Sequence, residues 1–228
     1  MRRLNILVEG RTEETFVRDV LSPALLSAGI VVTSRMPPTS KTGRGGGSSF
    51  LPWHRAALHW LLHDQTAYLT TMFDIYGLPG DFPQLEDSRN IGDIYQRATF
   101  LEASFHNTIA TEAPNAQRRF IPYLQMHEFE GLLFTDLAEL EALEADWSGR
   151  GLKCAAEAAH FPTPEHVNNS VHTAPSKRLA QHFVRPQYRK TLHGTLAAQA
   201  IGVARIRQQC KRFDAWLSSL TLLPPLLA

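Results

Sequence analysis

The stretch that decides the fold is LNILVEG at residues 4–10. Its compact apolar run ends at Glu9 and a glycine, which is typical of a strand buried on both faces of a parallel sheet. Apolar residues follow at helical spacing over residues 16–21, and a β-branched run, IVVT, occupies residues 30–33. The opening of the chain therefore predicts a strand, a helix and a second strand.

The same alternation continues along the chain. Further strands are predicted at Tyr68–Phe73 (YLTTMF) and Phe120–Met126 (FIPYLQM). Helical spacing of apolar residues predicts helices at Trp53–His63, Ile91–Phe105, Gly131–Ala145, Ser176–Phe183 and Leu196–Leu220. Alternating strands and helices predict an α/β fold with a mostly parallel sheet of about four strands flanked by helices. We expect one domain at residues 1–150 and a basic helical C-terminal extension, residues 151–228, packed on it.

Acidic residues stand where the predicted strands end. Glu9 follows the first strand, Asp74 follows the third, and Glu128 and Glu130 follow the fourth. Ligands bind outside the carboxyl ends of strands in such sheets. Converging carboxylates repel one another, and a divalent cation with a preference for hard oxygen ligands removes that repulsion. The pattern predicts a Mg²⁺ or Mn²⁺ site.

Each acid also has a structural interpretation. Glu9 could be a solvated loop acid, and Asp74 could form a turn. Glu128 could pair with a cation from the C-terminal third, and Glu130 could satisfy a helix dipole. Glu13 and Glu14 fit the dipole of the first helix, although one of them could reach the metal. His127 stands beside Glu128 without a partner motif.

The charge distribution is uneven. The 228 residues carry a net charge of +1, yet the stretch from Val167 to Phe213 contains no acidic residue. This basic third predicts contacts with the phosphates of nucleic acid, and the candidates are Lys177, Arg178, Arg185, Arg189 and Lys190. The alternative is that these cations only cover solvated helix faces.

Several classes of site and location are disfavoured. The only cysteines, Cys154 and Cys210, cannot form a four-cysteine zinc site or a disulfide scaffold. No H-E-x-x-H motif occurs, and the glycine-rich loop at residues 36–49 lacks the ending of a P-loop. The apolar run at the N-terminus is too short for a signal peptide or a membrane span, so we expect a cytoplasmic protein.

Four segments in order carry a family resemblance. They are VEGRTEETFV at Val8–Val17, FDIYGLP at Phe73–Pro79, QMHEFEGLLF at Gln125–Phe134 and APSKR at Ala174–Arg178. Together they resemble an uncharacterised bacterial family of the Toprim superfamily, akin to the Toprim part of OLD-type nucleases. The resemblance covers most of the chain.

The resemblance implies roles for individual residues. Glu9 would be the general acid or base, and Asp74 would bind metal. The usual D-x-D motif is here Asp74-Ile75-Tyr76, so Glu128 or Glu130 would have to replace the missing aspartate. Lys177 is the match for a catalytic lysine near the end of such domains. Related chains stand in phage-defence operons beside an SMC-like ATPase, which is therefore an expected partner.

The leading hypothesis is a metal-dependent nuclease that hydrolyses phosphodiester bonds in DNA or RNA. Two alternatives remain open at this stage. One is a non-catalytic protein that binds nucleic acid or an ATPase through its basic helices. The other is a different phosphoryl-transfer enzyme, such as a nucleotidyltransferase.

Overall fold

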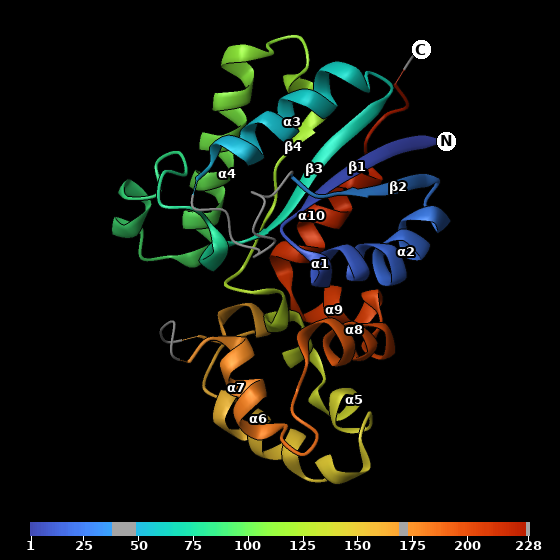
Figure 1. Cartoon of the computed structure of the whole chain (residues 1–228), viewed down its shortest axis with the longest axis vertical. Helices are drawn as coiled ribbons and strands as arrows, with labels where there is room; N and C mark the ends of the chain where they lie inside the picture. The colour runs from blue at the N-terminus through green and yellow to red at the C-terminus, as the bar shows by residue number, and fades with distance from the viewer. Residues whose placement is uncertain (38–48, 169–172, 227–228) are drawn as a thin grey trace.

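The structure is a computed structural model that describes residues 1–37, 49–168 and 173–226. Within these ranges five strands form a sheet of order β2-β1-β3-β4, with β5 also paired to β3, and every pairing is parallel. The predicted α/β class, with a mostly parallel sheet flanked by helices, is confirmed (Figure 1). The strands are β1 Arg2–Val8, β2 Ile30–Arg35, β3 Ala67–Asp74, β4 Phe120–Ile121 and β5 Leu124–Gln125. Most of the predicted glycine-rich loop, residues 38–48, lies outside the described residues.

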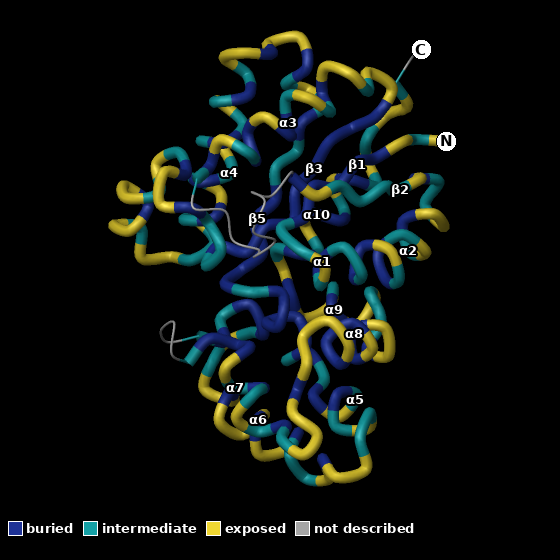
Figure 2. Tube along the Cα trace, viewed as in Figure 1, coloured by how far each residue is buried: buried dark blue, intermediate teal, exposed yellow. Residues whose placement is uncertain are grey.

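Helices cover both faces of the sheet, and the alternation of side chains along each strand explains why. Leu4, Ile6 and Val8 of β1 pack toward α1 (Arg11–Phe16), a π-helical turn η1 (Val17–Leu21), α2 (Ser22–Ser27) and α10 (Lys211–Thr221). Leu7 points to the opposite face, toward α3 (Leu51–His63) and α4 (Ile94–Glu112). Figure 2 shows β3 buried along its length, as its eight buried residues require.

The prediction of one continuous fourth strand is wrong. Residues Phe120–Met126 form two short strands, β4 and β5, separated at Pro122, which has no backbone N–H to donate to a neighbouring strand. The hydroxyl of Thr71 bridges the break, because it accepts from the Tyr123 N–H at 2.9 Å and donates to the Tyr123 carbonyl at 2.7 Å. The interruption turns the chain toward the next group of helices.

Two predicted helices are also divided. Gly131–Ala145 contains the 3-10 helix η5 (Phe129–Thr135) and the short α5 (Leu137–Glu141), whose first turn is capped by the Asp136 side chain. Leu196–Leu220 is divided into α8 (Thr195–Ile201), α9 (Val203–Gln209) and α10. The first break falls at Gly202, whose φ of +78° only glycine adopts readily.

The segment from residue 129 to residue 209 forms a helical lobe below the carboxyl ends of the strands (Figure 1). It also contains α6 (Arg150–Ala158), α7 (Pro175–His182) and the π-helical turn η8 (Lys190–Gly194). The domain boundary predicted after residue 150 falls at the first residue of α6, and α6 packs against α5. The remaining short helices are η2 Ile75–Gly77, η3 Asp87–Asn90, η4 Gln117–Arg119, η6 Ala145–Trp147 and η7 Pro164–His166.

The last helix returns from the helical lobe to the sheet. Trp216 of α10 stacks on Tyr123, with ring centroids 4.2 Å apart, and its indole N–H donates to the Thr70 hydroxyl at 2.9 Å. The Tyr68 hydroxyl donates to the Pro224 carbonyl at 2.9 Å. Among the described helices, none combines the length and hydropathy needed to cross a membrane.

Candidate functional site

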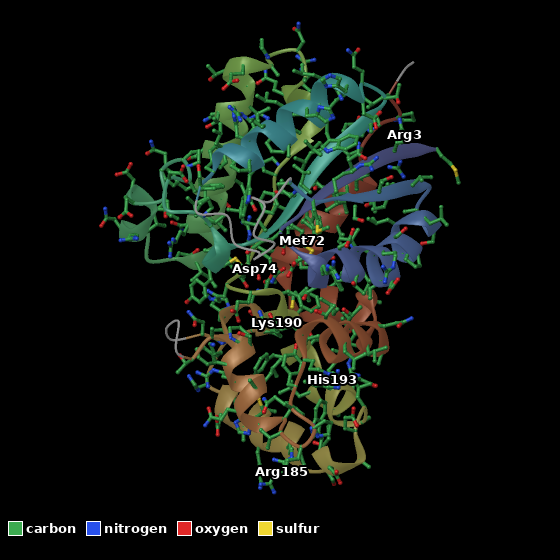
Figure 3. All side chains as sticks on the ribbon, viewed as in Figure 1. Arg3, Met72, Asp74, Arg185, Lys190 and His193 are labelled. Carbon is green, nitrogen blue, oxygen red and sulfur yellow. The ribbon has the colours of Figure 1, made fainter. Side chains whose placement is uncertain are left out.

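The first two acids of the site come together because β1 and β3 are neighbours in the sheet. Val8 pairs with Met72 in parallel register, so Glu9 and Asp74 leave the sheet at the same edge. Asp74 also pairs with Gln125 of β5, and this brings the following loop to that edge. Asp74 lies where the sheet meets the helical lobe (Figure 3).

Three further carboxylates reach this edge from α1 and η5. Glu13 lies in the first turn of α1, directly after the Glu9–Gly10 turn, and is buried. Glu128 precedes η5 and accepts a hydrogen bond from the Ser176 N–H at 2.9 Å. Glu130 lies in the first turn of η5 and is 1% exposed. The carboxylates therefore come from three separate stretches of the chain.

One lysine supplies the positive charge. The Nζ of Lys190 lies 3.0 Å from Oε1 of Glu130 and 3.9 Å from Oε1 of Glu128. Lys190 begins η8, which packs against α1, and Figure 3 shows it on the helical-lobe side, close to Asp74. The carboxylates raise the pKa of Lys190 although burial opposes this, so the ammonium stays charged. Its side chain is 47% exposed and therefore reachable from solvent.

The pKa values of the acids are raised by burial and by the negative charges of their neighbours. Burial, followed by the charge of Glu13, raises the pKa of Glu9 from 4.5 to about 7. Burial and the charges of Glu13, Glu9 and Glu130 raise the pKa of Asp74 well above its usual value. Burial raises the pKa of Glu130 to about 6, even though Lys190 acts against it. Among the described residues, Lys190 thus does not compensate the charge of the carboxylates, and a further cation would stabilise their charged form.

The donor set can be tested for its fit to a metal ion. In the part of the chain that is described, no three His, Cys, Asp or Glu side chains already converge on one coordination position. Mg²⁺, however, is usually held by one or two carboxylates and keeps several waters. Glu9 Oε2 and Asp74 Oδ1 are buried oxygens without a hydrogen-bond partner among the described residues. This pair, with Glu13, Glu128 and Glu130 nearby, fits Mg²⁺ or Mn²⁺.

Gly77 leaves the space that the carboxylate of Glu9 occupies. A Cβ atom at Gly77 would lie 2.3 Å from Oε2 and 2.5 Å from Oε1 of Glu9. The Glu9 carboxylate therefore occupies the space that any larger residue at position 77 would fill. Gly77 is the last residue of η2, which begins directly after Asp74. The same short segment therefore provides one candidate metal ligand, Asp74, and the space for the carboxylate of the other, Glu9.

The structure places the basic residues predicted to bind nucleic acid at different distances from the carboxylates. Lys177 is exposed on α7, next to Ser176, and makes no ion pair with an acid of the described residues. Arg178 lies over the Phe161 ring at 5.4 Å and donates to the Thr173 carbonyl. Arg189 is exposed, and Arg185 lies at the far end of the helical lobe (Figure 3). Of this set, Lys190 is the residue that contacts the carboxylates.

Three residues of the site could not be placed there from the sequence. Lys190 was grouped with the phosphate contacts, because nothing local shows that η8 folds back onto residues 60 positions earlier. Gly77 was not singled out, since its role depends on the position of the Glu9 side chain. Glu13 was weighed mainly as a dipole partner, and its burial beside Asp74 becomes evident only in the fold.

Comparison with known proteins gives one match. The sequence model of a family described as "Domain of unknown function (DUF4276)" matches residues 8–221. The matched range includes the carboxylates, Gly77 and Lys190. No curated protein and no solved structure gives a significant match to the chain.

Proposed function

The chain belongs to the DUF4276 family, and from the geometry of its site we propose that it hydrolyses phosphodiester bonds of nucleic acid with Mg²⁺ or Mn²⁺. One observation carries the proposal: Glu9 and Asp74 lie at the same carboxyl edge of the sheet, and each has a buried carboxylate oxygen that no group of the described residues satisfies. Lys190 stands beside them as a cation that can face a phosphate.

The residues divide into binding and proton-transfer roles. When bound, Mg²⁺ or Mn²⁺ would polarise a phosphoryl oxygen and lower the pKa of a bound water molecule. Asp74 and Glu9 would hold the cation, with Glu128 and Glu130 as the further carboxylates. Glu9 is also the candidate for the group that accepts and returns a proton, as the family resemblance implies.

Lys190 takes the role of neutralising the charge that develops on the phosphoryl group. The sequence pattern favoured Lys177 for this role. Lys190 is the better candidate because its ammonium already lies 3.0 Å from Glu130, whereas Lys177 makes no ion pair with a described acid.

The specific form of the proposal is a Toprim-type nuclease of the kind found in OLD-type proteins. Acids after the first and a later strand support it, as does the parallel sheet that carries them. Tyr76 stands where the second aspartate of D-x-D is expected, and the buried Glu13 and Glu130 offer replacement carboxylates. An SMC-like ATPase partner and a role in phage defence remain predictions from the resemblance.

The test is cleavage of plasmid DNA, single-stranded DNA and tRNA by the purified protein. We expect products with Mn²⁺ or Mg²⁺ and none with EDTA, and we expect calorimetry to detect Mn²⁺ binding. Failure to bind Mn²⁺ would refute the metal site. Nucleic-acid binding that persists in EDTA without cleavage would instead favour a non-catalytic interaction protein.

A substitution at Gly77 tests the positioning of Glu9. In Gly77→Ala the added methyl group must displace the Glu9 carboxylate, and displacement of a reacting group by about 1 Å can lower a rate by about 100-fold. The side chain of Glu9 can swing away, so we expect the free energy of unfolding to change by less than about 1 kcal/mol. Rates of cleavage and urea denaturation measure the two effects.

Gly80→Ala is the matched control for this experiment. Gly80 lies in the same loop, and a Cβ atom there meets nothing within 4 Å. We expect wild-type activity from Gly80→Ala. Equal activity of Gly77→Ala and Gly80→Ala would show that the position of Glu9 does not matter for the reaction.

A further inference from the structure

A second group of polar side chains lies beside the carboxylates and has no part in the chemistry described so far. Tyr76 belongs to η2, His127 to the turn between β5 and η5, and Arg97 to the start of α4. The Tyr76 N–H donates to the His127 carbonyl at 3.1 Å, and the two rings lie 5.2 Å apart at 47°. These contacts join the loops that carry Asp74 and Glu128.

His127 is held in an unfavourable state. Its φ of +58° is in the left-handed region, which is unfavourable for a residue other than glycine. Its side chain is buried, at 9% exposure, and Nδ1 has no hydrogen-bond partner among the described residues. A buried polar atom without a partner adds a desolvation penalty, because its hydrogen bond with water is lost and not replaced. Both penalties fall on one residue next to the site, which indicates that a ligand normally satisfies Nδ1.

Arg97 brings a positive charge to the same place. Its Nε donates to the Ser88 hydroxyl at 3.2 Å, and it forms no ion pair with an acid in residues 1–37, 49–168 or 173–226. Burial lowers the pKa of His127, and the charges of His166 and Arg97 act in the same direction. Burial raises the pKa of Tyr76, and Arg97 opposes this rise. The charge of Arg97 therefore affects both His127 and Tyr76, which indicates that its guanidinium lies near both rings.

The side chains of Arg97, His127 and Tyr76 offer hydrogen-bond donors for a phosphate and an aromatic ring for a base. A guanidinium without a carboxylate partner binds phosphate through two parallel hydrogen bonds, and an imidazole N–H can donate one more. Tyr76 is partly exposed, and its hydroxyl accepts from the Asn168 side chain, which fixes the ring. A fixed aromatic ring offers a surface on which a base can stack.

We propose that Arg97, His127 and Tyr76 bind the nucleotide next to the scissile phosphodiester, so that the substrate is a nucleic acid strand with at least two phosphates. This inference rests on the proposed function. Arg97 holds the flanking phosphate, His127 donates to one of its oxygens, and Tyr76 faces the adjoining base. A free mononucleotide would occupy the carboxylate site alone and leave this group unsatisfied.

The experiment measures binding without turnover. A fluorescent single-stranded DNA of about 12 nucleotides, a length within the usual range of single-strand sites, is titrated with the protein in Ca²⁺ buffer at several NaCl concentrations. Arg97→Gln is expected to weaken binding by about 10-fold and to make the slope of log K against log salt smaller by about 0.7. His127→Asn is expected to weaken binding while preserving the fold, because Asn tolerates the left-handed region.

Arg118→Gln provides the matched control. Arg118 is exposed in η4, just before β4 and therefore at the opposite edge of the sheet, so its loss should change neither affinity nor salt slope. The inference is overturned if the wild-type protein does not bind the DNA, or if Arg97→Gln and Arg118→Gln behave alike. Lack of cleavage in Mn²⁺ together with Arg97-dependent binding would refute the hydrolytic function but support this subsite.

Discussion

Glu9→Gln is expected to abolish metal-dependent hydrolysis and, at the same time, to stabilise the metal-free protein above neutral pH. The loss of a proton acceptor and metal ligand should lower the rate by about 10²–10⁴-fold. The gain in stability follows from the pKa of Glu9, which burial and Glu13 raise from 4.5 to about 7. At 1.36 kcal/mol for each pKa unit the upper bound is about 3 kcal/mol, and partial solvation reduces the expected gain to about 1–2 kcal/mol.

The sign of the effect follows from proton linkage. The folded protein binds the Glu9 proton more tightly than the unfolded chain does, so charged Glu9 destabilises the fold above about pH 7. As the pH falls from about 7 to 4.5, the folded form takes up the proton and the destabilisation disappears. Urea denaturation in EDTA should therefore show a stability difference between Glu9→Gln and the wild type at about pH 8 that vanishes near pH 4.5.

Glu14→Gln is the control, since Glu14 lies in the same helical turn as Glu13. It should leave both activity and stability close to those of the wild type. A Glu9→Gln protein that is less stable than the wild type at pH 8, or that still cleaves nucleic acid, would contradict the assignment. Asp74→Asn is expected to lose activity in the same way, because the carboxylate that would hold the metal is replaced by a neutral amide.

Lys190→Met should produce the second large effect. Glu130 is 1% exposed and has its ion pair with Lys190, so removal of the ammonium leaves a buried carboxylate without a counter-charge. Because the lysine itself is half exposed, we expect destabilisation of about 1–3 kcal/mol rather than the larger value of a fully buried pair. Loss of the cation that faces the phosphoryl group should lower the cleavage rate by about 100-fold or more.

Lys177→Met distinguishes the two candidate lysines. Lys177 is exposed, so its replacement should change the free energy of unfolding by less than about 0.5 kcal/mol. If cleavage falls in Lys177→Met and not in Lys190→Met, the role belongs to Lys177, as the family resemblance suggested. Lys211→Met, an exposed change at the start of α10, controls for the loss of a positive charge elsewhere.

The balance of charge links these predictions. Lys190 is the one lysine that contacts the carboxylates within the described residues, and several acids retain raised pKa values despite it. Mn²⁺ binding should therefore be accompanied by proton release near neutral pH, because the cation favours the charged carboxylates. Calorimetry in two buffers of different ionisation enthalpy would detect the released protons.

The sequence by itself determined the strands and the carboxylates at their ends. LNILVEG predicted β1 and Glu9, and YLTTMF followed by Asp74 predicted β3, because short apolar runs in an alternating α/β pattern allow little except buried parallel strands. The acids could be assigned to one edge of the sheet since parallel strands end on the same side. Pro122 could have revealed the break between β4 and β5, as it cannot donate to a neighbouring strand.

Only the tertiary structure decided which side chains complete the site. Lys190 and Gly77 lie at the carboxylates because η8 returns to α1 and Glu9 packs on η2, and the packing of α4 on β5 brings Arg97 near Tyr76 and His127. None of these long-range contacts produces a periodic pattern in the sequence. Contacts between residues distant in sequence depend on how helices pack and not on local spacing. The choice between Lys177 and Lys190 was of this kind: both stand in the same basic stretch, and the fold brings one of them within 3.0 Å of Glu130.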